Sequence, residues 1–389
     1  MRVGVDEIVK LADRALDMEK YMREVKPLVE DVRRSGDLAL KRITEEFDGS
    51  GASKVEVEGL ISDLDEDLKR SIEVIVKSVE SFYRRLLPSS MSEDHGGVSR
   101  SVIWRPIRRV GIYVPRGYVS TLIMACSPAK VAGAERLVVV TPPLDGGVDP
   151  AMAYASSLIG AELYVANGVA GIAAMAFGTG TIPKVDKVVG PGNLYVQAAK
   201  LLVSPYVGID GIEGPTELVV LAQDFERLAA LEMASQLEHS GALGVLISTE
   251  EELLNRAEEL LNELIEAPYY TVRASDLEEA VSLINSLAPE HASLFGVPRD
   301  LVKEITEAGV VSFLTPSSLV DYVAGPSHVL PTGGSARWRG ILTPMDFMKA
   351  IAEVDGRSAS RELVDAAIKL AAYEGFSLHA RALGEAYGL

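Results

Sequence analysis

Apolar residues recur at helical spacing through the first quarter of the chain. Residues 6–47 read as an amphipathic helical stretch that restarts at Ser35-Gly36-Asp37, and residues 64–87 read as a second amphipathic helix. The apolar stripe of the second helix is formed by Ile72, Ile75, Val76, Val79 and Phe82. Because side chains at this spacing share one helical face, we expect both segments to pack against a core.

Two series of short Val-rich runs alternate with helix-length segments in the rest of the chain. The first series comprises residues 136–140, 163–166 and 187–189. The second comprises residues 216–221, 244–248, 269–273 and 310–314. Such alternation indicates parallel sheets covered by helices on both faces. We therefore predict the α/β class, with two doubly wound (Rossmann-like) lobes and helical N-terminal and C-terminal attachments.

Length and charge narrow this picture. A chain of 389 residues exceeds what one core usually serves, which agrees with two lobes. The chain has 38 Lys and Arg against 56 Asp and Glu, for a net charge of −18. Binding to a phosphate backbone needs a concentrated basic surface, so we expect no nucleic-acid partner.

The single cysteine and the N-terminus indicate a cytoplasmic protein. Cys126 excludes an internal disulfide, and its apolar surroundings favour a buried core residue over a nucleophile. Residues 1–7 lack the apolar block of a signal peptide. The uncharged stretch 163–183 is long enough to span a bilayer, but Asn167 and several glycines divide it into a strand, a turn and a helix. We therefore expect no membrane partner.

Gln236 and His239 stand three residues apart at the end of a predicted helix that begins at Asp224. Three residues are nearly one turn, so both side chains would share a face and could bind one metal ion. The alternative is a solvated Gln236 and a His239 that caps the helix C-terminus.

Glu290 and His291 follow Pro289, which must end the preceding helix. In a loop, both side chains can point at one ligand, and a carboxylate beside an imidazole suits proton transfer near neutral pH. The alternative is a solvated turn.

Further candidates lie towards the C-terminus. Asp321 is a plausible oxygen ligand, with His328 behind it, and Glu374 and His379 add one more carboxylate and imidazole. Gln236, His239, Asp321 and His379 together form a possible four-coordinate nitrogen and oxygen site for Zn²⁺ or another first-row divalent ion.

A glycine-containing segment, Gly190-Pro191-Gly192-Asn193, connects a predicted strand with a predicted helix. Its backbone amides could face an anion or a nucleotide. A simple tight turn is the alternative, and the chain has no Gly-x-Gly-x-x-Gly fingerprint.

Read in order, several long motifs resemble the histidinol dehydrogenase family. They are Val110-Gly111-Ile112-Tyr113-Val114-Pro115, residues 184–193, Glu213-Gly214-Pro215-Thr216-Glu217, Gln236-Leu237-Glu238-His239, Ala288-Pro289-Glu290-His291, residues 324–331 and Glu374-Gly375-Phe376-Ser377-Leu378-His379. The resemblance covers nearly three quarters of the chain, from about Arg105 to the end. The N-terminal part shares only its helical character with the family.

The resemblance implies a two-step, NAD-dependent oxidation of L-histidinol through an aldehyde to L-histidine, the last step of histidine biosynthesis. It implies one Zn²⁺ per subunit, held by Gln236, His239, Asp321 and His379. It also implies that Glu290 and His291 are the catalytic acid/base pair.

The resemblance assigns further contacts. Substrate would be contacted by Thr216, Glu374, His291 and the four metal ligands, and NAD by Tyr113 and Asn193. The family is a homodimer whose C-terminal segment reaches the partner's site, so that the active sites are shared. Ala170 stands where the family usually has Gln, which removes one expected NAD contact.

The resemblance also implies how the chain divides. Residues 1–22 would form an N-terminal helical arm, and residues 23–108 plus 217–341 a first α/β lobe with the metal and acid/base residues. Residues 109–216 would form a second, NAD-binding lobe, and residues 342–389 a helical tail that reaches the partner subunit.

Three alternatives remain open from the sequence. A related dehydrogenase of this fold could oxidise another polar alcohol. A zinc hydrolase could use Glu290 and metal-bound water without NAD. A non-catalytic dimer could have lost cofactor binding, as the alanine at position 170 would suggest.

Overall fold

The computed structural model describes residues 1–13, 18–62, 64–144 and 147–389. Contacts within the chain define two compact units. The larger contains residues 1–86 and 107–347, and the smaller contains residues 87–106 and 348–389. Within the described residues, the larger unit holds two six-stranded sheets, named sheet I and sheet II below, and the smaller holds a three-stranded sheet.

Sheet I has the strand order of a doubly wound fold. Its strands, in spatial order, are β2 (Ser53–Lys54), β7 (Glu162–Val165), β6 (Arg136–Thr141), β5 (Arg109–Tyr113), β8 (Lys187–Val189) and β9 (Gly208–Ile209). All neighbours are parallel except β2, which runs antiparallel to β7. The strand order reverses between β5 and β8, so the carboxyl ends of these two strands form the switch point where such sheets bind ligands.

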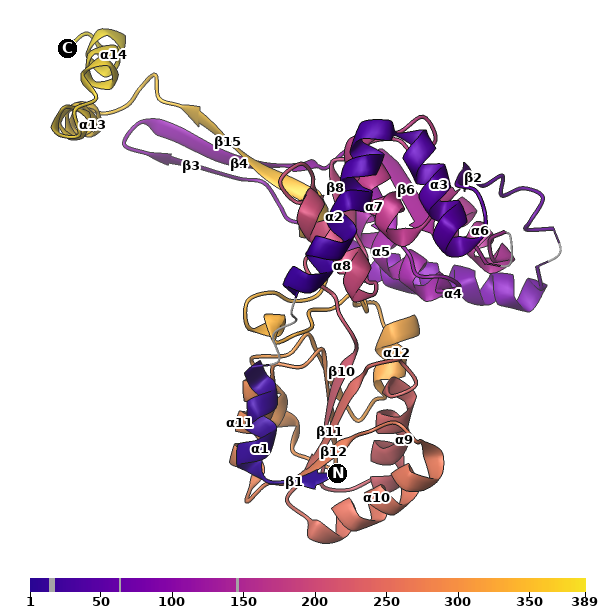
Figure 1. The fold of residues 1–389 in the computed structure, drawn as a ribbon. Coiled ribbons are helices and arrows are strands. Elements are labelled where there is room, and N and C mark those ends of the chain that lie inside the picture. The colour runs from indigo at the N-terminus through magenta and orange to yellow at the C-terminus, as the bar shows by residue number, and fades with distance from the viewer. Residues whose placement is uncertain (14–17, 63, 145–146) are drawn as a thin grey trace. The chain divides into compact units, whose positions relative to one another are not determined.

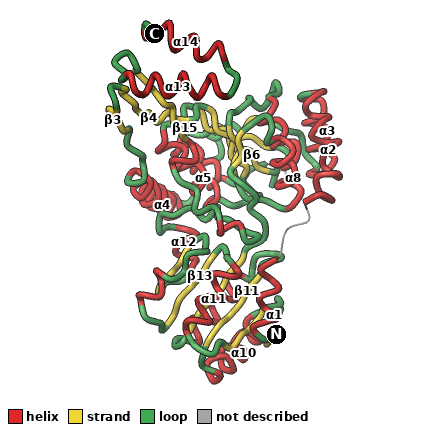
Figure 2. The backbone as a smooth tube through the Cα atoms, turned by 90° about the vertical axis from the view of Figure 1, so that its left-hand side faces the viewer, coloured by secondary structure: helices red, strands yellow, loops and turns green. Residues whose placement is uncertain are grey.

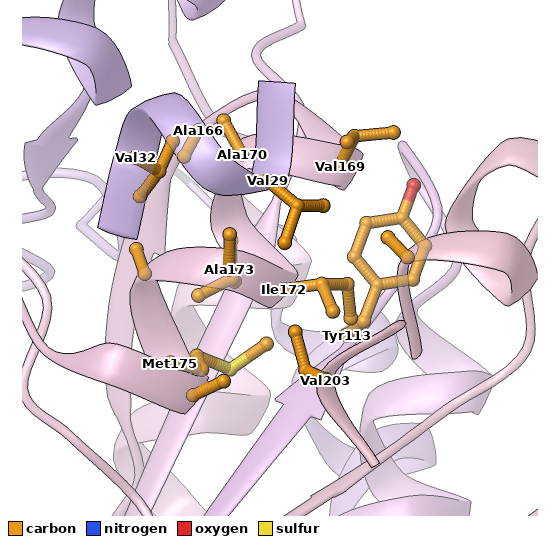
Figure 3. Close-up of a cluster of buried hydrophobic side chains, with 14 of the residues drawn as sticks. Val29, Val32, Tyr113, Ala166, Val169, Ala170, Ile172, Ala173, Met175 and Val203 are labelled. Atoms are coloured by element: carbon orange, nitrogen blue, oxygen red, sulfur yellow. The ribbon is translucent and has the colours of Figure 1, made fainter. Parts of the chain in front are cut away.

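Helices cover both faces of sheet I. On one face lie α4 (Glu66–Arg84), α5 (Val119–Ala132) and α6 (Pro150–Ile159), and on the other lie α2 (Met18–Ser35), α3 (Asp37–Asp48), α7 (Gly168–Phe177) and α8 (Leu194–Val203). Figure 3 shows Val29 and Val32 of α2 packed with Ala170 and Ala173 of α7. Each buried valine of this kind contributes roughly 1.5–3 kcal/mol.

These contacts correct the expected division of the chain. Helices α2, α3 and α4 pack on sheet I, because their apolar faces meet α5 to α8. Helix α4 also contacts residues 323–327, for example through Ser78 Oγ, which donates to the Val323 carbonyl oxygen. The predicted helix break is confirmed, since α2 ends at Ser35 and α3 begins at Asp37 after Gly36, which has a φ of 57°. Residues 14–17 of the predicted helical stretch lie outside the described residues.

Sheet II repeats the same strand order. Its strands, all parallel, are β1 (Arg2–Val3), β12 (Tyr270–Arg273), β11 (Leu243–Ser248), β10 (Glu217–Ala222), β13 (His291–Phe295) and β14 (Val310–Phe313). Alternate residues of β10 face opposite cores: Leu218 and Val220 face one, Val219 and Leu221 the other. Strands with apolar residues on both faces are expected for a sheet covered on both sides, and helices and strands alternate accordingly along the chain (Figure 2).

The lobe built on sheet II includes the N-terminus of the chain among its strands and helices. Its helices are α1 (Val5–Val9), α9 (Glu226–Gln236), α10 (Glu251–Leu264), α11 (Leu277–Leu287) and α12 (Ser317–Tyr322), with short 3₁₀ turns at η1 (Lys10–Asp13), η2 (Arg299–Lys303) and η3 (Ser335–Arg337). A further 3₁₀ turn, η4 (Pro344–Phe347), packs on α5 of the sheet I lobe. Residues 2–3 pair with β12, and α1 packs on α11, so the start of the expected helical arm is an edge strand and a short helix of this lobe.

The smaller unit consists of an antiparallel sheet and two helices. Its elements are β3 (Met91–His95), β4 (Val98–Pro106), β15 (Met348–Asp355), α13 (Arg361–Tyr373) and α14 (Ser377–Tyr387). The expected helical tail, residues 342–389, therefore contains a strand as well as helices, because β15 pairs along its whole length with β4. The two helices pack on each other (Figure 1).

Two expectations about single segments are confirmed. Cys126 is fully buried in α5, and burial raises the pKa of its thiol. The uncharged stretch 163–183 forms part of β7 and then α7. Across the part of the chain that the structure describes, no helix combines the length and apolarity needed to cross a bilayer.

Candidate active site

Glu290 and His291 lie at the amino edge of sheet II. Helix α11 ends at Leu287, Ala288 takes a positive φ of 45°, and His291 is the first residue of β13. Glu290 is 7% exposed and His291 is 2% exposed. The solvated-turn alternative is therefore wrong. The pair also lies opposite the carboxyl edge, where ligands usually bind in doubly wound sheets.

Glu290 is a buried carboxyl group with one hydrogen bond from the backbone. Its Oε2 accepts from the Glu217 amide at 3.1 Å, across the start of β10. Burial raises the pKa of Glu290 well above 4.5, and the nearby Asp321 carboxylate raises it further, although the Glu217 amide opposes the shift. The carboxyl group therefore holds a proton more tightly than an exposed glutamate does.

His291 is neutral at physiological pH. Burial lowers the pKa of the ring to about 3, assisted by His328 and His239. Its Nε2 lies 3.5 Å from Asp321 Oδ1 and 3.9 Å from Glu290 Oε1. No residue in the described ranges hydrogen-bonds its Nδ1. A neutral imidazole with a free nitrogen, beside a carboxyl group of raised pKa, is an arrangement that can exchange protons with a bound molecule.

Gln236 and Asp321 meet at the ends of α9 and α12. Gln236 Nε2 donates to Asp321 Oδ2 at 2.6 Å, and burial raises the pKa of Asp321 to about 7. Within the described residues, no Lys or Arg pairs with this carboxylate. A buried carboxylate without a cation beside an amide oxygen fits a divalent metal ion, which would supply the missing positive charge.

His239 lies in the turn after α9, because the helix ends at Gln236. This corrects the expectation that both side chains share one helical face. The His239 side chain is exposed, and its charge contributes to the lowered pKa values of His291 and His328. In the described part of the chain, no three His, Cys, Asp or Glu side chains form a metal-binding group.

Glu374 and His379 belong to the smaller unit. Glu374 follows α13, and His379 lies in the first turns of α14, with its ring 5.2 Å from that of Phe376. Both side chains are exposed. These two residues remain candidates for a role in another subunit.

His328 supports Asp321. Its Nδ1 lies 2.8 Å from the Asp321 carbonyl oxygen, and its Nε2 lies 2.9 Å from Thr121 Oγ1. Because a carbonyl can only accept, Nδ1 carries the proton, and the Thr121 hydroxyl donates to Nε2. Burial lowers the pKa of His328 to about 4, so the ring is a neutral connection between α5 and the segment after α12.

Tyr113 and Gly190 form the switch point of sheet I. Gly190 has a φ of 125°, and a Cβ there would lie 2.1 Å from the Tyr113 carbonyl oxygen. A Cβ at Gly192 would lie 3.0 Å from the Tyr113 ring. In the described structure, residues 190–193 contain no backbone turn hydrogen bond, so close packing on Tyr113, not a tight turn, explains these glycines.

Asn193 caps helix α8. Its side-chain oxygen accepts from the Tyr195 and Val196 amides, both at 3.1 Å. None of the described residues accepts a hydrogen bond from its side-chain NH₂ group. Thr216 is half-buried just before β10, and its carbonyl accepts from the Leu243 amide. Ala170 is fully buried beneath α2.

A buried ion cluster beside this loop was not predicted from the sequence. Lys200 is fully buried, and its Nζ lies 2.5 Å from Asp210, 2.6 Å from Glu213 and 2.9 Å from the Gly190 carbonyl oxygen. Burial alone would lower the pKa of Lys200, but the two carboxylates raise it. Arg339 also contacts Glu213 at 2.7 Å. The sequence feature that could have indicated this cluster is Lys200 itself, because it is the one charged residue in the mostly apolar run 194–203.

Two doubly wound lobes, with a buried carboxyl group beside a buried imidazole, are an architecture typical of α/β enzymes. The family model described as histidinol dehydrogenase matches residues 11–385. The chain belongs to the histidinol dehydrogenase family.

Relatives and a solved structure agree with this assignment. The histidinol dehydrogenase of Saccharolobus solfataricus is 42% identical, over 96% of this chain and 98% of its own length. That of Pyrobaculum aerophilum is 45% identical, over 79% of this chain and 83% of its own length. The crystal structure of histidinol dehydrogenase from Elizabethkingia anophelis superposes with a TM-score of 0.92 at 28% identity, covering 99% of this chain and 97% of that one.

Proposed function

We propose that the protein catalyses the NAD-dependent oxidation of L-histidinol, through histidinal, to L-histidine, with one Zn²⁺ per subunit. Family membership supports the overall reaction. The observation that carries the proposal is the buried pair of Glu290 and neutral His291, placed beside Gln236 and Asp321.

The metal would be held by Gln236, His239 and Asp321 of one subunit and by His379 of the other. Bound Zn²⁺ would orient the imidazole and amine of the substrate, and bound NAD⁺ would accept a hydride in each oxidation. Thr216 and Glu374 would complete the substrate site, and Tyr113 and Asn193 the NAD site.

His291 would take the proton of the substrate hydroxyl in the first oxidation. Its lowered pKa keeps the ring neutral and ready to accept. The second oxidation needs water to add to the aldehyde, and Glu290, within 3.9 Å of His291, would accept a proton from that water once its own proton has been released. The two side chains would thus divide the proton transfers between them.

A homodimer with shared sites is part of the proposal, and the surface of the smaller unit supports it. Helices α13 and α14 and the loop between them expose large apolar side chains: Leu370, Tyr373, Phe376 and Leu378. Exposed apolar groups on neighbouring elements are typical of an interface, and a second copy of this chain is the occupant that would place His379 and Glu374 at a site.

A stoichiometric assay tests the proposal. The purified protein is incubated with L-histidinol, Zn²⁺ and NAD⁺, and absorbance of NADH is followed. We expect two NADH per histidinol. Turnover of another polar alcohol without turnover of histidinol would favour a related dehydrogenase, and no NADH from any alcohol would favour a hydrolase or a non-catalytic dimer.

A further inference from the structure

The side-chain amide of Gln236 uses both of its hydrogens inside the protein. Nε2 donates to Ser317 Oγ at 2.8 Å and to Asp321 Oδ2 at 2.6 Å. An amide NH₂ has two hydrogens to donate, so both are accounted for. Among the described residues, none donates to Gln236 Oε1. This oxygen is therefore the part of the side chain that remains available to a ligand.

Glu232 fixes the position of Ser317. The Glu232 side chain lies one helical turn before Gln236 on α9 and is 2% exposed. Its Oε1 accepts from the Ser317 backbone amide at 2.8 Å and from Ser293 Oγ at 2.7 Å. Ser317 is the first residue of α12, the helix that also carries Asp321. One carboxylate thereby anchors the start of α12 to α9.

This network selects one of the two orientations of the Gln236 amide. A rotation by 180° about the terminal bond would place Oε1 against Asp321 Oδ2, 2.6 Å away in the present contact, and two oxygen acceptors would face each other. The Ser317 hydroxyl accepts from Nε2 in the present orientation but could donate to a flipped Oε1, so Ser317 fixes the place of the amide group and not its orientation. The repulsion at Asp321 therefore selects the orientation of an amide that Ser317 holds in place.

We infer that Ser317, held by Glu232, is a positioning residue that keeps the Gln236 amide oxygen directed to a divalent cation. The inference rests on the proposed zinc site and adds two residues to which neither the sequence motifs nor the resemblance assigns a role. Supporting hydrogen bonds of this kind orient ligands before the metal arrives.

Metal affinity of the Ser317→Ala variant tests the inference. The substitution removes the hydroxyl acceptor and leaves the backbone amide of residue 317 with Glu232. Zn²⁺ binding to the full-length protein is measured by competition with a chromophoric chelator, and the thermal midpoint of the metal-free protein is measured in parallel. We expect an affinity about 10-fold weaker, the lower end of effects seen for such supporting groups.

Ser293→Ala is the matched control. It removes the other hydroxyl bound to Glu232 Oε1 but does not touch Gln236. We expect its Zn²⁺ affinity to stay within about twofold of wild type, even where the thermal midpoints of the two variants fall equally. Equal Zn²⁺ affinity of wild type and Ser317→Ala, or an equal loss in both variants, would overturn the inference alone. Failure of the wild type to bind Zn²⁺ would overturn the proposed cofactor and the inference together.

Discussion

Lys200 and Asp210 are both fully buried, and their charged atoms lie 2.5 Å apart beneath the loop that begins at Gly190. Replacing Lys200 by Met leaves Asp210 and Glu213 buried without their shared cation. The removal of one partner from a buried ion pair usually costs about 3–5 kcal/mol. We expect the midpoint of thermal unfolding to fall by many degrees.

The exposed pair of Lys303 and Asp300 provides the control for that experiment. Its atoms lie 3.6 Å apart, and water screens both side chains. Lys303→Met should leave the midpoint unchanged. If both lysine variants melt alike, the buried cluster is not a stabilising element.

Replacement of His291 by Asn should lower turnover of histidinol by roughly 10²–10⁴-fold, because the proton acceptor is lost. The zinc content, measured by atomic emission after gel filtration, should not change, since His291 is not among the proposed ligands. Loss of zinc in this variant would mean that the role of His291 is misassigned.

Subunit mixing tests whether the sites are shared. An inactive His379→Ala dimer and an inactive His291→Asn dimer are exchanged and assayed. If His379 serves the partner, one of the two sites of each mixed dimer regains all of its residues, and activity returns. Persistent inactivity despite exchange shown by native mass spectrometry would contradict sharing.

Glu162 should make stability depend on pH in acid. Arg136 lowers the pKa of this carboxyl group to about 2, with Tyr164 and Lys54 assisting against burial. The folded-state pKa lies below the unfolded value near 4.5, so the stabilisation is complete above pH 4.5 and is lost as the pH falls towards 2. In Glu162→Gln, the loss of unfolding free energy between pH 4.5 and pH 2 should be smaller by about 1 kcal/mol. The effect is modest because the carboxyl group is partly exposed.

Asp355 is the control for the acid titration. Arg357, two residues away, lowers the pKa of Asp355 to about 2, but the carboxylate is exposed. Asp355→Asn should leave the curve of unfolding midpoint against pH as it is. If the pH dependence of the unfolding midpoint decreased equally in both variants, the contacts of Glu162 within sheet I would not be the cause of the acid destabilisation.

Restoring the family's glutamine at position 170 should destabilise the protein. Ala170 is fully buried among residues of α2 and α7, and a larger side chain in a filled core typically costs about 1–3 kcal/mol. Ala170→Gln should lower the unfolding midpoint, whereas Ser157→Gln, on the exposed side of α6, should not. Tighter NAD binding without loss of stability in Ala170→Gln would contradict the packing described here.

The fold class could be predicted because alternation of Val-rich strands with helices is a local signal. The placement of α2 to α4 could not, since an amphipathic stripe such as that of Val25, Val29 and Val32 shows that a helix buries one face without showing against which sheet. Strand β15 escaped notice for a related reason. Its residues are mostly exposed and gain their conformation from pairing with β4.

The candidate site, like the fold, could be predicted from the sequence only in part. Gln236, Asp321 and Glu290 are far apart in sequence, so their residue types indicated only a possible metal site with Gln236 and Asp321 in it. The family resemblance was needed to join Glu290 to that site. The structure brings Gln236, Asp321, Glu290 and His291 close together, whereas His239 lies beyond the helix and His379 belongs to the smaller unit. Glu232 and Lys200 were missed because a charged residue inside an amphipathic or apolar helix gives no indication, from sequence, of a buried partner.

Glu290 and His291 lie at the amino edge of sheet II, and the loops at the other end of its strands lie at the opposite edge. Ser275 is exposed in one of these loops, and the native thiol of Cys126 is fully buried. A cysteine introduced at Ser275 would therefore accept a maleimide dye selectively. Such a fluorescent label would report motions of this lobe during turnover from the edge of the sheet opposite Glu290 and His291.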